Sequence, residues 1–264
     1  MLIAVVIGLF ASVAIALAGY RARVLTLDGA LAAVVVGTAV FGFGGVRWAA
    51  VMVGFFVFSS ALSRLGRRRK REAEQFVEKG SRRDAVQVLA NGGVAAILAL
   101  VHQFGGVGNL FPAYLGAMAA ATADTWSTEI GSLSATPPRS ILTGKIVEPG
   151  TSGGVTMLGL LASMAGGLVI GLIGGIAGVS TLRMVLVGVV AGFAGSAVDS
   201  LIGATVQRTY RCPQCGAFTE RPVHGCGTTT VPVRGWAVVN NDTVNGLTTL
   251  FGALCGAIVF RLIG

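Results

Sequence analysis

Charged residues are scarce in this chain of 264 residues, because only 12% are Asp, Glu, Lys or Arg. An ordinary soluble domain carries about twice that fraction. Hydrophobic residues make up 53% of the chain, and the mean hydropathy is +0.78. The shortage of charge therefore excludes a soluble globular domain and predicts a protein embedded in a lipid bilayer.

Period-two alternation of apolar and polar residues is also missing, so a transmembrane β-barrel is not expected. Instead, eight apolar stretches have the length that an α-helix needs to cross about 30 Å of hydrocarbon. They cover residues 1–19, 29–46, 48–63, 85–103, 112–130, 154–178, 182–206 and 244–262. The first stretch has no basic n-region and is taken as a span, not a cleaved signal. We expect a single all-α domain, 1–264, folded as a polytopic transmembrane bundle of about eight helices.

The 40 glycines suit close packing between membrane helices, as at Gly188-xxx-Gly192 and Gly252-xxx-Gly256. A dinucleotide-binding loop at residues 171–178 is rejected, because no strand is expected before it.

Lys and Arg are distributed unevenly between the loops, and this predicts the orientation. Placing segment 64–84 in the cytoplasm puts 17 of the 20 basic residues inside and leaves Arg47, Arg183 and Arg261 outside. Both termini then lie outside the plasma membrane. Three loops are cytoplasmic: the basic loop 64–84, the Gly-rich loop 131–153 and the Cys/His loop 207–240. The basic loop is interpreted as a topology signal that also contacts anionic lipid headgroups, and no nucleic acid partner is expected.

Four carboxylates lie in or beside the spans, where an ionisable group costs a few kcal/mol. They are Asp124, Glu129, Asp199 and Asp242, and all lie toward cytoplasmic helix ends in this orientation. Interhelical hydrogen bonding that merely holds the bundle together is the alternative. Repulsion between these acids, with no Lys or Arg beside them in the spans, instead favours a bound cation. Oxygen ligands suit Mg²⁺, which typically binds together with the phosphates of a substrate.

Uncharged polar side chains accompany these acids and can orient a phosphate or a nucleobase. Several share a helix face through i, i+4 spacing or occur beside an acid. The predicted substrate-binding set is Gln87, Asn91, Thr128, Gln207, Asn241 and Asn245.

The Gly-rich loop ends in a turn that leads into the next span and presents main-chain N–H groups to an anion. The turn consists of Gly150, Thr151, Ser152, Gly153 and Gly154. Arg139 and Lys145 lie nearby in sequence and are included in the predicted anion site. The turn is not a Walker A motif, and a plain flexible connector is the alternative.

The Cys/His loop contains Cys212, Cys215, His224 and Cys226 within 15 residues, which fits a tetrahedral zinc site. A disulfide is disfavoured on the reducing side of the membrane. Redox-active or free thiols remain alternatives. Four protein ligands would close the zinc shell, so a structural role is expected.

Five segments carry a family resemblance: QVLANGG (87–93), ATADTWSTEIG (121–131), PGTSGGVT (149–156), VDSLIGATVQ (198–207) and NNDTVN (240–245). With them the chain resembles the integral-membrane family, domain of unknown function 92, that contains plant phytyl-phosphate kinase and the transmembrane protein 19-like proteins. The resemblance implies phosphoryl transfer from CTP or ATP to an isoprenyl monophosphate at the cytoplasmic face.

On that view, Asp124, Glu129, Asp199 and Asp242 hold Mg²⁺, while the glycine turn holds the nucleotide phosphates. Two other functions stay open, a lipid-phosphate nucleotidyltransferase and a carrier or flippase for a phosphorylated lipid. Formation of a homo-oligomer also stays open.

Overall fold

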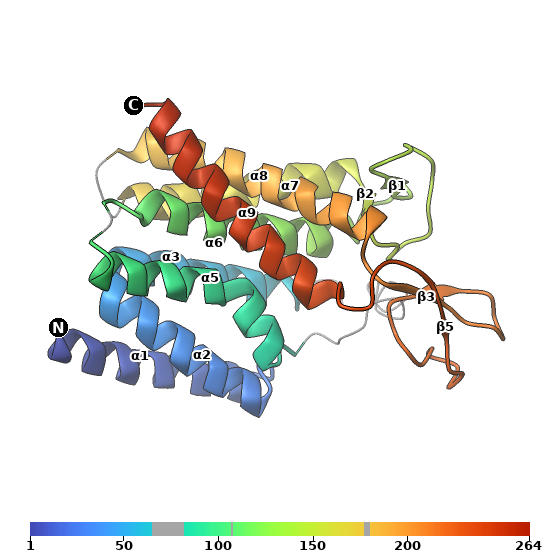
Figure 1. The fold of residues 1–264 in the computed structure, drawn as a ribbon, viewed down its shortest axis with the longest axis horizontal. Coiled ribbons are helices and arrows are strands. Elements are labelled where there is room, and N and C mark those ends of the chain that lie inside the picture. The colour runs from blue at the N-terminus through green and yellow to red at the C-terminus, as the bar shows by residue number, and fades with distance from the viewer. Residues whose placement is uncertain (65–81, 107, 177–179) are drawn as a thin grey trace.

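The computed structural model describes residues 1–64, 82–106, 108–176 and 180–264, and most of the predicted basic loop 64–84 lies outside these residues. The bundle is built from long helices connected by short turns at one end and longer loops at the other (Figure 1). Its helices are α1 (Leu2–Arg21), α2 (Leu27–Ala39) with the π-helical turn η1 (Val40–Gly44), α3 (Val46–Leu62), α5 (Ala85–Phe104), α6 (Phe111–Gly131), α7 (Met157–Ile176), α8 (Thr181–Thr205) and α9 (Asn241–Leu262).

Six of the described helical segments are long and apolar enough to cross a membrane. They are α1, α2 together with η1, α5, α7, α8 and α9, while α3 is apolar but shorter. The predicted polytopic helical bundle is therefore confirmed.

Helix α6 forms the centre of the bundle. Every residue from Phe111 to Ala123 is buried, and α6 packs against α3, α5, α7, α8 and α9. Small residues permit this close packing, because a Cβ atom built on Gly256 would lie 2.5 Å from the carbonyl oxygen of Pro112. A Cβ atom built on Gly252 would lie 2.6 Å from the carbonyl oxygen of Gly116, also on α6. The packing role predicted for the Gly252-xxx-Gly256 motif is therefore confirmed.

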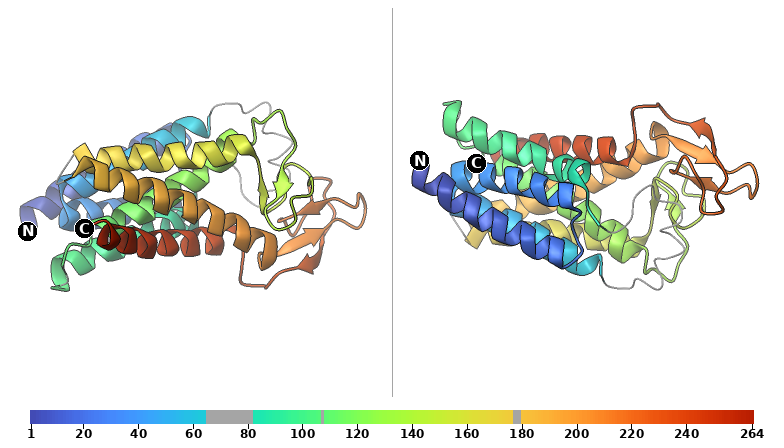
Figure 2. Two further views of the ribbon diagram at one scale, coloured as in Figure 1. Left: turned by 90° about the horizontal axis from the view of Figure 1, so that it is seen from above. Right: turned by 90° about the horizontal axis from the view of Figure 1, so that it is seen from below.

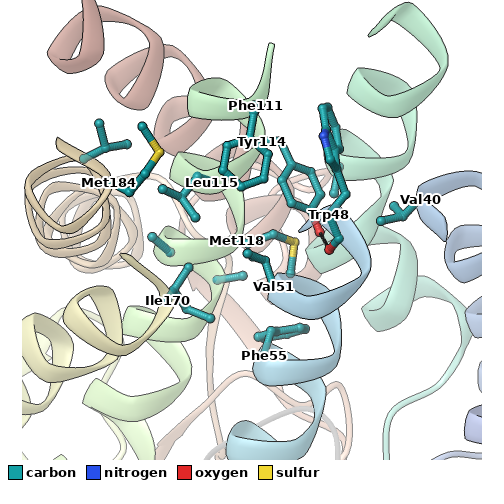
Figure 3. Close-up of a cluster of buried hydrophobic side chains, with 14 of the residues drawn as sticks. Val40, Trp48, Val51, Phe55, Phe111, Tyr114, Leu115, Met118, Ile170 and Met184 are labelled. Atoms are coloured by element: carbon teal, nitrogen blue, oxygen red, sulfur yellow. Dashed lines mark hydrogen bonds between the residues drawn. The ribbon is translucent and has the colours of Figure 1, made fainter. Parts of the chain in front are cut away.

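A hydrophobic cluster packs α3 against α6 (Figure 3). Tyr114 and Trp48 lie side by side, and the Tyr114 hydroxyl donates a 2.6 Å hydrogen bond to the carbonyl oxygen of Trp48. Met118 and Ile170 extend the cluster toward α7. The polar group of a buried tyrosine is thereby satisfied without water.

Both chain termini lie at one end of the bundle, and the loops that carry strands lie at the opposite end (Figure 2). One antiparallel pair joins β1 (Arg139–Ser140) to β2 (Gly154–Val155). A three-stranded antiparallel sheet has the order β4 (Phe218–Thr219), β3 (Thr209–Arg211), β5 (Val231–Arg234). These short strands are additions to the all-helical prediction and belong to the Gly-rich and Cys/His loops.

Two predicted span boundaries need correction. The span expected from residue 154 begins as α7 at Met157, because Gly154 belongs to β2 and the Thr156 hydroxyl accepts a 3.0 Å hydrogen bond from the amide of Gly159. The span expected from residue 244 begins as α9 at Asn241, because Asn240 caps it by accepting a hydrogen bond from the Thr243 amide.

Candidate functional site

A cavity of about 600 Å³ opens among the loops at the end of the bundle opposite the termini. Its walls come from the last turns of α6 and α8, the first residue of α9 and the loop that joins α6 to α7. Ten of the predicted site residues line it: Asp124, Thr128, Gly150, Thr151, Ser152, Gly153, Gly154, Asp199, Gln207 and Asn241. Segments that are far apart in the sequence are thus brought to one place.

Two aspartates meet in this cavity. The carboxyl groups of Asp124 on α6 and Asp199 on α8 lie close enough to interact directly, and the hydroxyl of Thr248 on α9 donates a 3.1 Å hydrogen bond to Asp199 Oδ2. Two carboxylates in contact repel each other unless a cation or a proton lies between them. The pair is therefore suited to hold a divalent cation with oxygen ligands.

The helix contact one turn before the pair explains why such short side chains can meet. Gly195 precedes Asp199 by four residues, and Ala120 precedes Asp124 by four. A Cβ atom built on Gly195 would lie 2.5 Å from the Ala120 Cβ, so a glycine is needed at this point of contact. The small residues bring α6 and α8 close enough for their aspartates to interact.

The glycine turn forms a second wall. Gly150 and Gly153 have φ values of +87° and +79°, a conformation that favours glycine. Gly153 also lies against α8, since a Cβ atom there would be 2.7 Å from the carbonyl oxygen of Ser200. Among the described residues, the amides of Ser152 and Gly153 donate no hydrogen bond to another protein group. Such N–H groups can bind a phosphate oxygen.

Glu220 is a cavity residue that sequence reasoning missed. Its Oε1 atom accepts hydrogen bonds from the Ser152 hydroxyl at 2.6 Å and from the Gln207 side-chain amide at 2.9 Å. Glu220 follows β4 in the Cys/His loop, and this position carries no signal in the sequence because carboxylates are ordinary in aqueous loops. The cavity thus has three acidic residues in its wall, and no Lys or Arg lines it within the described part of the chain.

Glu129 and Asp242 do not line this cavity. The Glu129 carboxylate interacts electrostatically with the guanidinium of Arg83, which precedes α5. Asp242 is buried in the first turn of α9, and Asn245 lies on the same helix, about one turn beyond Asn241. Of the four predicted acids, the structure brings Asp124 and Asp199 together.

The two predicted cationic residues of the Gly-rich loop do not line the cavity either. The Arg139 guanidinium donates a 2.9 Å hydrogen bond to the carbonyl oxygen of Gly144 and so holds its own loop together. Lys145 is exposed in the same loop.

Gln87 and Asn91 lie elsewhere, beside a small apolar cavity of about 80 Å³ that α1, α2, α3, α5 and α6 surround. Gln87 takes part in a capping box. The Asp84 carboxylate accepts a hydrogen bond from the main-chain amide of Gln87, and the Gln87 side chain accepts one from the main-chain amide of Asp84. The Asn91 side chain donates a hydrogen bond to the main-chain carbonyl oxygen of Gln87. The side-chain amides of Gln87 and Asn91 are therefore both hydrogen-bonded to the main chain at the start of α5.

The Cys/His loop brings its four predicted ligands together. One ligand atom from each of Cys212, Cys215, His224 and Cys226 lies within 4.8 Å of the others, a group that could hold a metal ion. The Thr228 hydroxyl and the His224 imidazole lower the pKa of the Cys226 thiol to about 6. The adjacent Cys212 thiol and burial raise the pKa of Cys215 to about 11.

Comparisons with known proteins place the chain among membrane proteins. A family model described as integral membrane protein DUF92 matches residues 10–253. Protein PGR of Arabidopsis thaliana is 34% identical over 261 residues, covering 89% of each chain. An uncharacterized membrane protein of Methanocaldococcus jannaschii is 30% identical over 91% of this chain and 87% of its own length. An uncharacterized membrane protein of Synechocystis is 27% identical over 83% of this chain and 76% of its own length. No solved structure matches.

Proposed function

The chain belongs to the DUF92 family of integral membrane proteins, and on this premise we propose that it transfers a phosphoryl group from a nucleoside triphosphate to an isoprenyl monophosphate. Membership confirms the family resemblance that the five sequence motifs predicted. The observation that carries the proposal is one cavity that contains both a pair of contacting carboxylates and a glycine turn with available amides.

The carboxylate pair supplies the cation site. Asp124 and Asp199 fit Mg²⁺, since their oxygens converge and no Lys or Arg lines the described part of the cavity to neutralise them. Bound Mg²⁺ would neutralise charge on the transferring phosphate, which is the main requirement of this reaction class. The metal is assigned to these two residues, because Glu129 and Asp242 do not line the cavity.

The glycine turn supplies the anion site. The amides of Ser152 and Gly153 would bind phosphate oxygens, and Thr128 and Asn241 line the same cavity with uncharged polar groups. This replaces the cationic contacts expected from Arg139 and Lys145, whose side chains lie outside the lining.

The chemistry needs no strong base. An oxygen of the isoprenyl phosphate attacks the γ-phosphorus of the nucleotide, a P–O bond forms, and the bond to the departing nucleoside diphosphate breaks. The attacking oxygen is already anionic, so the products are an isoprenyl diphosphate and a nucleoside diphosphate. CTP and ATP are the donors to test.

We place the cavity at the cytoplasmic face of the plasma membrane, with both termini outside. The excess of Lys and Arg in the loops at the cavity end supports this orientation, since Arg139, Lys145, Arg208, Arg211, Arg221 and Arg234 all belong to that end. The acceptor phosphate would then meet nucleotide from the cytosol while its prenyl chain stays in the bilayer.

Product analysis tests the proposal. Purified protein in detergent is incubated with Mg²⁺, prenyl monophosphates of several chain lengths, and CTP or ATP labelled in either the base or the γ-phosphate. Transfer of the γ-label to a prenyl diphosphate, with release of nucleoside diphosphate, is the expected result. Incorporation of the base label into lipid with release of pyrophosphate would overturn it in favour of a nucleotidyltransferase. Uptake of prenyl phosphate into proteoliposomes without nucleotide consumption would overturn it in favour of a carrier.

A further inference from the structure

The sulfur and nitrogen atoms of the Cys/His cluster lie close enough together to share one tetrahedral metal ion. Cys226 Sγ lies 3.6 Å from Cys212 Sγ and 3.8 Å from Cys215 Sγ. Two thiolates on one tetrahedral zinc ion, each bound at about 2.3 Å, are about 3.8 Å apart. A disulfide would bring two sulfurs to about 2.05 Å, so these cysteines are arranged around a common centre and are not paired with each other.

The histidine completes the set through one nitrogen. His224 Nδ1 lies 3.2 Å from Cys215 Sγ and 3.1 Å from Cys226 Sγ. A nitrogen and a sulfur bound to the same zinc ion are about 3.5 Å apart. Three sulfurs and one nitrogen therefore converge, the usual ligand types of a closed structural site.

A tight turn that ends in a glycine closes each arm of the cluster. Gly216 follows Cys215 with φ +73°, and its amide donates a 2.9 Å hydrogen bond to the carbonyl oxygen of Cys212. Gly227 follows Cys226 with φ +83°, and its amide donates a 2.9 Å bond to the carbonyl oxygen of His224. Each tight turn brings a ligand pair back toward one point, and the glycine accepts the left-handed conformation that the turn requires.

The cluster is joined to the cavity through the short sheet. Cys212 directly follows β3, which pairs with β4, and Glu220 directly follows β4 and reaches Ser152 of the glycine turn. On the other side of β3, β5 ends at Arg234, whose guanidinium donates to the carbonyl oxygens of Gly203 and Ala204 at 2.9 Å and 2.8 Å. The same strands therefore attach to the glycine turn and to the end of α8.

We propose that Cys212, Cys215, Cys226 and Nδ1 of His224 bind one structural zinc ion, and that this ion holds the β3–β4–β5 sheet so that Glu220 fixes the glycine turn. Zinc closes the loop at the point where two turns converge, in a segment whose strands have only two to four residues each. The site is independent of the phosphoryl transfer proposed above, because metal content and backbone protection are measured without turnover.

Metal analysis of the full chain, purified in detergent without added metal, tests the site. We expect about one zinc ion per chain, and loss of that zinc in Cys212→Ser and in Cys226→Ser. Cys255→Ser is the matched control, since this cysteine lies on α9 outside the cluster and should leave the zinc content unchanged. Substitution with Co²⁺ should give the absorption of a tetrahedral thiolate site. No zinc in the unmodified protein, or equal zinc in the Cys212 variant, would overturn the site.

Hydrogen exchange tests the connection to the cavity and guards against misfolded variants. Zinc is removed from the unmodified protein with a high-affinity chelator and then restored. Amides in segment 207–240, and in segment 149–154 the bonded amides of Thr151 and Gly154, should lose protection without zinc and regain it on restoration, while α1 should stay unchanged. Glu220→Ala, which removes the acceptor of the Ser152 and Gln207 hydrogen bonds, should keep the zinc but lose protection in segment 149–154. Unchanged protection in that segment after zinc removal would overturn the proposed bracing of the glycine turn.

Discussion

The carboxyl groups of Asp124 and Asp199 meet across the contact between α6 and α8, in the wall of the largest cavity described. Their separation along the chain is 75 residues, and the helices meet there because Gly195 and Ala120 allow close approach one turn earlier. The pair concentrates negative charge in the same cavity that the glycine turn lines.

Replacing either aspartate by the isosteric amide should remove turnover and leave the fold intact. Asp124→Asn and Asp199→Asn each delete a metal ligand, so the rate should fall about 100-fold or more, since a catalytic metal contributes several kcal/mol. Turnover of prenyl phosphate and the elution volume in detergent are the measurements. Glu129→Gln is the control, because Glu129 lies outside the cavity lining and should retain most of the activity. An equal loss in all three variants would contradict the assignment to the pair.

Adding and removing Mg²⁺ should change the thermal stability through the same two residues. A cation that binds only the folded state stabilises it by about 2.7 kcal/mol at 100 times its dissociation constant. The melting temperature of the unmodified protein should therefore rise with Mg²⁺ and return after chelation. Asp124→Asn should have a Mg²⁺-independent melting temperature. A rise of the same size in that variant would show that the cation binds elsewhere.

Two neighbouring threonines on α9 offer a matched pair of variants. The Thr248 hydroxyl donates to Asp199 Oδ2, whereas the Thr249 hydroxyl donates to the carbonyl oxygens of Ala90 and Gly246. Thr248→Val should lower the apparent affinity for Mg²⁺ about 10-fold, because it removes a bond that orients a metal ligand. Thr249→Val should leave this affinity unchanged. Titration of the Mg²⁺ dependence of the rate distinguishes the two, and equal effects would refute an orienting role for Thr248.

The sequence predicted the helices and much of the cavity for physical reasons. Apolar length sets the spans, and alternation of the loops puts the ends of α6 and α8 at the same side of the bundle, where Asp124, Asp199 and Gln207 meet the glycine turn. The side of each helix that faces the cavity is set by packing. For this reason Glu129, five residues after Asp124, interacts with Arg83 instead.

Other contacts depend on information that spacing does not carry. Asp84 and Gln87 are three residues apart, which fits both a shared helix face and a capping box, and the structure has the capping box. Glu220 reaches the cavity only because β4 pairs with β3, a contact made in a loop where hydropathy has no pattern. The start of α7 at Met157 depends on the pairing of β2 with β1, which uses Gly154.

The Tyr114 hydroxyl should contribute to stability and not to turnover. It is buried in the first turn of α6, donates to the carbonyl oxygen of Trp48 and does not line the cavity. Tyr114→Phe should lower the free energy of unfolding by about 1 kcal/mol, the usual net value of such a bond. Tyr20→Phe is the control, since Tyr20 is 40% exposed. Thermal melting in detergent measures both variants, and a lower rate at an unchanged melting temperature for Tyr114→Phe would contradict the assignment.

Gly153 should be intolerant of even a methyl group, because two independent constraints act at this residue. Its φ of +79° disfavours a Cβ atom, and a Cβ atom would also lie 2.7 Å from the carbonyl oxygen of Ser200, which belongs to α8 and cannot move aside easily. Gly153→Ala should therefore displace the turn from α8 and raise the apparent KM for the nucleotide about 10-fold or more, as expected when the loss is in binding. Gly93→Ala is the control, since a Cβ atom on Gly93 meets no atom within 4 Å and helix propensity favours alanine there.

Nucleotide titrations at saturating prenyl phosphate measure both variants. An unchanged KM in Gly153→Ala would mean that the glycine turn is a connector and that the phosphates bind elsewhere in the cavity.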